Sequence, residues 1–127
     1  MTKKPRLLVV DNEIDVCNFV KSFFELRGFD VMTAYNGDEA LKILETTKVD
    51  IIILDVIMRR EDEGIEYLPK IKKKCPTTKV VMVTGVDDKE VFEKAKKLGA
   101  DDYITKPLVL EYLESTVMNK LKSLSGK

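Results

Sequence analysis

Short apolar runs alternate along this chain with longer stretches in which apolar residues recur at helical spacing. The apolar runs predict strands near residues 6–10, 30–34, 50–54, 79–83 and 101–104. The stretches that follow them predict helices over about residues 14–27, 37–46, 65–73, 88–98 and from just beyond 107. Strands that alternate with amphipathic helices are typical of a parallel sheet with right-handed crossovers. We therefore expect an α/β fold.

The helix faces support this prediction. Gly28 is expected to end the first helix, and the third is expected to close before Pro76. The predicted apolar faces comprise Val16, Val20, Phe23 and Phe24 in the first helix, Ala40, Leu41 and Leu44 in the second, and Leu110, Leu113, Val117 and Leu121 in the fifth.

Length and composition favour one cytoplasmic domain. A chain of 127 residues with 44% hydrophobic content can bury roughly two-thirds of its unfolded surface, so we expect a single domain over residues 1–127 and no output domain within it. The 22 basic and 22 acidic residues balance, which gives no general attraction to nucleic acid or to an anionic membrane. No apolar run approaches the ~20 residues needed to span a bilayer, and the first residues lack the apolar segment of a signal peptide.

The cysteines do not suggest a metal site. Cys17 and Cys75 have no second cysteine at metal-ligand spacing, and the chain contains no histidine. We expect two reduced structural thiols.

Polar side chains follow four of the predicted strands, at the point where each strand ends. Asp11 follows the first strand, Asp55 the third, Thr84 the fourth and Lys106 the fifth. Because ligands collect at the carboxyl ends of parallel strands, these side chains are expected to meet at one edge of the sheet. Two carboxylates, a hydroxyl and an amine are suited to a hard cation, a phosphoryl group, or both.

Phosphoryl transfer explains these residue types. It needs an in-line nucleophile, a metal ion, and fixed positive or hydrogen-bonding groups for the remaining charge. Asp55 is the candidate nucleophile, since a carboxylate can form an acyl phosphate. The alternative is that Asp55 only caps the turn after its strand.

Four fragments, in this order, resemble the receiver domain of two-component response regulators. They are residues 7–13, the strand ending in Asp55, the step from Val83 to Gly85, and residues 99–107. The resemblance covers nearly the whole chain. It implies a flavodoxin-like, doubly wound fold with five helices and a five-stranded parallel sheet in strand order 2-1-3-4-5.

The resemblance also implies a metal site. Asn12 and Asp55 would bind Mg²⁺ (or Mn²⁺) directly, the backbone carbonyl of Ile57 would be the third protein ligand, and Asp11 would act through water. Asn12 stands where the family usually has a second acid, so we expect weaker metal binding. Glu13 is expected to begin the first helix, although a ligand role for it stays open.

Catalytic and switch roles follow from the same resemblance. Thr84 and Lys106 would bind phosphoryl oxygens, and Tyr103 would turn inward when the Thr84 hydroxyl moves toward the phosphoryl group. The surface of the fourth helix, fifth strand and fifth helix would then change shape. The alternatives are that Thr84 caps the fourth helix, Lys106 is a solvated lysine and Tyr103 is a half-buried core residue.

The predicted function is therefore a phosphorylation-dependent switch. A histidine kinase or histidine phosphotransfer protein would donate the phosphoryl group, and a downstream protein or an output domain would receive the signal. We expect no enzyme activity beyond the domain's own phosphoryl transfer and slow dephosphorylation. Ile57 and Val86 resemble the family positions that flank the approach of water to the phosphoryl group; both are apolar, so we expect a long-lived phosphoryl state. Partner specificity is expected in Asp15, Asn18, Phe19, Ser22 and Leu108.

Other functions remain as alternatives. The loop over residues 59–63 is longer and more charged than the family pattern, which together with Asn12 leaves open a phosphorylation-independent interaction module. An aspartate-nucleophile phosphohydrolase would need a second aspartate where Glu13 stands. A flavin-binding protein is disfavoured because the acids after the first strand would repel phosphate.

Overall fold

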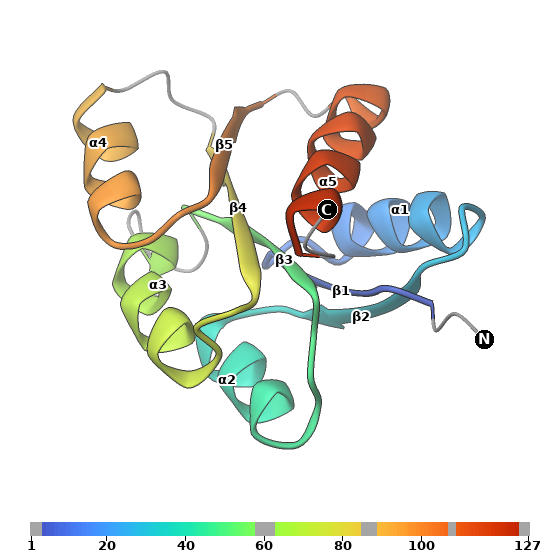
Figure 1. Ribbon diagram of the computed structural model, residues 1–127, viewed down its shortest axis with the longest axis horizontal. Coiled ribbons are helices and arrows are strands. Elements are labelled where there is room, and N and C mark those ends of the chain that lie inside the picture. Colours follow the sequence, from blue (N-terminus) through green and yellow to red (C-terminus); the bar gives the residue numbers. More distant parts are fainter. Residues whose placement is uncertain (1–3, 58–62, 85–88, 107–108, 125–127) are drawn as a thin grey trace.

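The computed structural model describes residues 4–57, 63–84, 89–106 and 109–124 and shows one sheet between two layers of helices (Figure 1). The strands are β1 (Arg6–Val10), β2 (Asp30–Ala34), β3 (Ile51–Asp55), β4 (Lys79–Thr84) and β5 (Asp102–Thr105). The helices are α1 (Ile14–Glu25), α2 (Gly37–Thr46), α3 (Glu63–Lys74), α4 (Lys89–Lys97) and α5 (Leu110–Leu124). No helix within the described ranges is long and apolar enough to cross a membrane.

The sheet has the predicted topology. All paired strands are parallel, and their order is β2-β1-β3-β4-β5. The register aligns Asp55 with Val83 and Thr84 with Thr105, so β3, β4 and β5 end close to one another. The predicted α/β fold is confirmed.

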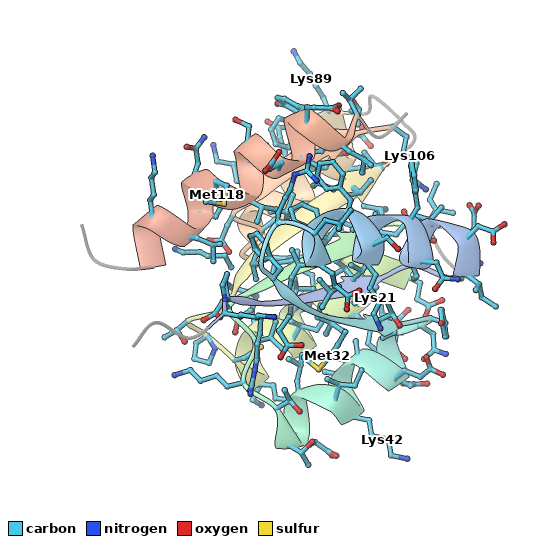
Figure 2. The ribbon with its side chains drawn as sticks, turned by 90° about the vertical axis from the view of Figure 1, so that its right-hand side faces the viewer. Lys21, Met32, Lys42, Lys89, Lys106 and Met118 are labelled. Atoms are coloured by element: carbon cyan, nitrogen blue, oxygen red, sulfur yellow. The ribbon has the colours of Figure 1, made fainter. Side chains whose placement is uncertain are left out.

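Alternate residues of the central strands face the two helical layers. In β1, Leu7 and Val9 pack toward α1 and α5, whereas Leu8 and Val10 pack toward α2, α3 and α4. Figure 2 views the layer of α1 and α5 from outside, with Lys21 and Met118 labelled on it. Because both faces of the sheet are covered, the strands are apolar at successive positions rather than at every second one. Burial of each large aliphatic side chain contributes roughly 1.5–3 kcal/mol.

Several boundaries differ from the prediction. Strand β3 spans Ile51–Asp55, one residue later than expected, so Asp55 is itself the last residue of the strand. Helix α1 ends at Glu25, two residues before the predicted end, and its buried face includes Cys17, which the prediction missed. Val16 and Phe23, predicted for that face, are only partly buried. Strand β5 also begins and ends one residue later than expected.

Helix α3 departs most from the prediction. It begins at Glu63 rather than at residue 65 and ends at Lys74 rather than at residue 73, with Pro69 inside the helix as in the prediction. The early start reflects tertiary packing, since Glu63 and Gly64 are buried against the neighbouring elements. The predicted start of helix four at residue 88 lies outside the described residues.

Candidate functional site

The carboxyl ends of β1, β3, β4 and β5 bring the predicted polar side chains to one edge of the sheet. The backbone N–H of Asp11 donates to the carbonyl of Ala34 at 3.0 Å, which places Asp11 directly beyond β1. The N–H of Lys106 donates to the carbonyl of Thr84 at 2.7 Å, which joins the ends of β4 and β5. Figure 2 labels Lys106 in the segment between β5 and α5.

Asp55 and Lys106 form an ion pair at the centre of this edge. The Nζ atom of Lys106 donates to Oδ2 of Asp55 at 3.1 Å, and the Asp55 side chain is only 2% exposed. Burial lowers the pKa of the Lys106 amine, but the Asp55 carboxylate together with the nearby acids Asp11 and Glu13 outweighs that effect and leaves the pKa raised. Lys106 is therefore a fixed cation directed at the site and not a solvated surface lysine.

The second oxygen of Asp55 makes a local contact. Oδ1 accepts the backbone N–H of Ile57 at 3.2 Å. This bond is the turn contact that the alternative interpretation of Asp55 requires, and it coexists with the ion pair. It holds the carboxylate in one orientation. A cap of the turn alone, however, would not explain why Lys106 also bonds to Asp55.

Asp11 adds a second buried acid next to Asp55. Its side chain is 4% exposed, and its Oδ1 accepts the backbone N–H of Glu13 at 2.9 Å. Burial and the nearby Asp11 carboxylate raise the pKa of Asp55 to about 7, although Lys106 opposes this shift. The positive charge of Lys106 therefore does not fully compensate for the burial of the Asp55 carboxylate and its repulsion by Asp11.

This donor set fits a small divalent cation. Mg²⁺ prefers carboxylate and carbonyl oxygens, binds few protein ligands and retains several waters. Asp11 and Asp55 offer buried carboxylates, whereas Asn12 is exposed at the same edge. Among the residues that the structure describes, no three or more His, Cys, Asp or Glu side chains form a group that could hold a metal ion, so a site here depends on amide and backbone oxygens.

Glu13 occupies the position immediately before α1. It is the N-cap residue of that helix, and its side chain makes no capping hydrogen bond. This placement agrees with the predicted helix-start role, in which the carboxylate interacts favourably with the helix dipole.

Thr84 is the last residue of β4, and its side chain is 1% exposed. The backbone of Thr84 lies one step beyond Val83, which pairs with Asp55. The alternative that Thr84 caps the fourth helix depends on residues 85–88, which lie outside the described residues, as does Val86.

Tyr103 in β5 packs against an aromatic side chain that the sequence interpretation did not single out. The rings of Tyr103 and Phe92 have centroids 4.4 Å apart and are tilted by 32°. A cavity of ≈160 Å³ beside them is lined by Phe92, Lys96, Ala100, Asp101, Asp102 and Tyr103. The sequence could have pointed to Phe92, because it is an aromatic residue in the otherwise largely charged helix α4.

Cys17 lies beneath the site on α1. Its Sγ donates to the carbonyl oxygen of Asp11 at 3.2 Å. Burial, with a further contribution from Asp11, raises the pKa of this thiol to about 11. Cys17 and Cys75 are both free cysteines in the structure; Cys17 is buried and Cys75 is partly buried.

Comparisons with known proteins agree with this geometry. Residues 7–118 match the family described as "Response regulator receiver domain". The alkaline phosphatase synthesis transcriptional regulatory protein PhoP of Bacillus subtilis is 42% identical over 109 residues, which are 84% of this chain and 43% of PhoP. The chain spans about half or less of the length of most curated relatives that it matches.

Solved structures agree as well. A CheY-like response regulator receiver domain protein from Methanospirillum hungatei superposes with a TM-score of 0.92 at 29% identity, over 98% of each chain. A response regulator from Burkholderia pseudomallei, solved with a phosphorylated aspartic acid, a calcium ion and citrate, has a TM-score of 0.84 at 26% identity and covers 97% of this chain and 72% of that one. The fold, the order of the polar strand ends and the match over residues 7–118 together establish that this chain belongs to the receiver domain family of two-component response regulators, a family of regulatory domains in phosphorylation-dependent signalling.

Proposed function

We propose that Asp55 accepts a phosphoryl group from a histidine kinase or histidine phosphotransfer protein, and that residues 1–127 act as one receiver domain. The observation that carries this proposal is the buried Asp55 carboxylate, 3.1 Å from the Lys106 amine at the carboxyl edge of the sheet. A carboxylate held there lies at the edge of the sheet where ligands collect, and its backbone stays fixed in β3.

The proposed transfer uses each polar group differently. One Asp55 oxygen forms the bond to phosphorus while the bond between phosphorus and the donor nitrogen breaks. Lys106 pairs with a phosphoryl oxygen as a compact charge, and the Thr84 hydroxyl donates a hydrogen bond to another. Lys106 must then exchange its contact with Asp55 for the new anion, which its partly exposed side chain permits.

Receiver domains bind Mg²⁺ in general. Here we propose that Asn12, Asp55 and the backbone carbonyl of Ile57 hold the ion directly, with Asp11 acting through water. When bound, the ion supplies positive charge for the phosphoryl oxygens. Asn12 contributes an oxygen without a charge, so we expect weaker binding than in a site with two adjacent acids.

The proposed output runs through Tyr103. Movement of the Thr84 hydroxyl toward the phosphoryl group frees space for the Tyr103 ring, which changes the surface formed by α4, β5 and α5. The contact between Tyr103 and Phe92 supports this route, because it links the ring to α4. The recipient is a downstream protein or an output domain.

The proposed kinase-facing surface is the exposed side of α1. Asp15, Asn18, Phe19 and Ser22 are all exposed there, and the Phe19 side chain is 66% exposed. Leu108, also expected to contribute, lies outside the described residues. The domain's own slow dephosphorylation completes the proposed cycle.

Intact-mass measurement tests this function. We expect wild-type protein incubated with acetyl phosphate and Mg²⁺ to gain the mass of one phosphoryl group, and Asp55→Asn to gain none. Asp30→Asn is the matched control, since Asp30 is also paired with a cation but lies on the surface, 3.6 Å from Arg6. A wild-type protein that gains no mass would favour the phosphorylation-independent interaction module, for which Asn12 is the supporting observation.

A further inference from the structure

Glu63 is a fully buried carboxylate outside the predicted site. It is the first residue of α3, and it is 0% exposed. Its Oε2 accepts the backbone N–H of Gly37 at 3.3 Å, and Gly37 is the first residue of α2. A buried carboxylate is costly unless it is hydrogen-bonded, and the first N–H groups of a helix need acceptors. This contact therefore ties the first turn of α3 to the start of α2.

The same turn of α3 packs against the backbone of the proposed phosphoacceptor. The N–H of Gly64 donates to the carbonyl of Val56 at 2.8 Å. A Cβ atom at Gly64 would lie 2.7 Å from Cα of Val56 and closer still to the carbonyl oxygen of Asp55. Glycine lets the two backbones approach this closely, so the first turn of α3 packs directly on the backbone of Asp55 and Val56.

Two hydrogen bonds also hold the segment from Asp55 to Ile57. The N–H of Val56 donates to the carbonyl of Val83 at 2.8 Å, and the N–H of Ile57 donates to Oδ1 of Asp55 at 3.2 Å. Gly64 supplies the matching contact from the helical layer. The first turn of α3 thus helps to place the backbone that carries the Asp55 carboxylate and the Ile57 carbonyl.

A neighbouring contact joins the same two helices without touching Asp55. Tyr67 lies one turn beyond Glu63, and its hydroxyl donates to Oδ1 of Asp38. Its ring covers Gly37, where a Cβ would lie 2.5 Å from Cδ1 of Tyr67. Loss of the Tyr67 hydroxyl should loosen the contact between α2 and α3 but leave the turn behind Asp55 in place. Tyr67→Phe is therefore a control for a purely structural effect.

From these contacts we infer that Glu63 is a positioning residue for phosphoryl transfer to Asp55. By bonding to the first N–H of α2, it holds the first turn of α3 against the backbone of Asp55 and Val56. This inference rests on the proposed function, since it concerns the reaction proposed for Asp55. Glu63 would thus act on the transfer from α3, through the backbone of Asp55 and Val56.

Two substitutions of Glu63 separate the effect of side-chain length from the effect of its charge. Glu63→Asp keeps the charge but is one methylene shorter, so it withdraws the acceptor from Gly37. Glu63→Gln keeps the length and an acceptor oxygen. Misplacement by about 1 Å can slow a reaction by about 10²-fold, so we expect Glu63→Asp to slow phosphorylation by acetyl phosphate by about tenfold or more. Glu63→Gln and Tyr67→Phe should stay within about threefold of wild type.

Amide hydrogen exchange at Gly64 provides a readout that does not need phosphorylation. We expect Glu63→Asp to accelerate exchange at this amide by about tenfold, because the first turn of α3 opens more often. If wild type is not phosphorylated, the proposed function fails. In that case, faster exchange of the Gly64 amide in Glu63→Asp still supports the anchoring role of Glu63. Unchanged exchange in that variant overturns the anchoring role. If wild type is phosphorylated, the inference is overturned when Glu63→Asp reacts at the wild-type rate, or when Tyr67→Phe slows the reaction as much as Glu63→Asp.

Discussion

Replacement of Asp55 by asparagine should stabilise the metal-free protein at pH 8. The Asp55 carboxylate is buried beside Asp11, and its pKa is raised from 3.8 to about 7. When folding raises the pKa of a carboxyl group, its protonated form favours the folded state. This contribution to stability is complete below the pKa of the unfolded state, and it is lost as the pH rises through the pKa of the folded state. Ionisation of Asp55 therefore opposes folding at neutral and alkaline pH.

The expected gain in the free energy of unfolding follows from the two pKa values of Asp55. The difference between 3.8 and about 7 corresponds to about 4 kcal/mol at pH 8, an upper limit. The substitution also removes the charged partner of Lys106, but the lysine side chain is 30% exposed and can recover hydration. We expect the free energy of unfolding of Asp55→Asn to exceed that of wild type by about 2–4 kcal/mol at pH 8. The gain should shrink steadily between pH 7 and pH 4.

Urea unfolding followed by far-UV circular dichroism, with EDTA present, measures this gain. Asp30→Asn is again the control: its ion pair with Arg6 is exposed at 47% and 55%, so its removal should change the free energy by less than about 1 kcal/mol. A destabilised Asp55→Asn at pH 8 would mean that the bond to Lys106 outweighs burial and repulsion. An equal gain at pH 5 and pH 8 would show that ionisation of Asp55 is not the cause.

Three further predictions address metal binding, phosphate lifetime and thiol chemistry. Asn12→Asp should tighten Mg²⁺ binding, because one added charge at ~4 Å is worth about 4 kcal/mol at a dielectric near 20 before desolvation and screening; a titration showing equal or weaker binding would place Asn12 away from the ion. Ile57→Asn should speed loss of phosphate from Asp55 by about tenfold in a single-turnover decay assay, since an amide can orient water where the 37%-exposed isoleucine cannot; slower decay would contradict this geometry. Cys17, whose burial raises its thiol pKa to about 11, should resist alkylation at pH 8 in native protein while Cys75 reacts first, as peptide mass mapping would reveal.

The sequence by itself determined the elements and the candidate chemistry. Apolar runs and helical spacing are local properties, so they identified the strands and helices to within about two residues. The polar residues Asp11, Asp55, Thr84 and Lys106 stood out because each follows an apolar run, and parallel strands bring such ends together. The strand order came only from the resemblance to receiver domains, since periodicity does not specify which strands pair.

Only the tertiary structure decided how these residues interact. The 3.1 Å contact of Lys106 with Asp55 depends on the register of three strands, and the raised pKa of Asp55 depends on burial beside Asp11. The role of Glu63 was likewise invisible, because in the sequence it is one acid in a charged loop. Its burial against Gly37 arises from the packing of α3 on α2, between residues 26 positions apart. Hydrophobic patterning records which side of an element is buried, whereas the partner of a buried polar group is set by contacts distant in the chain.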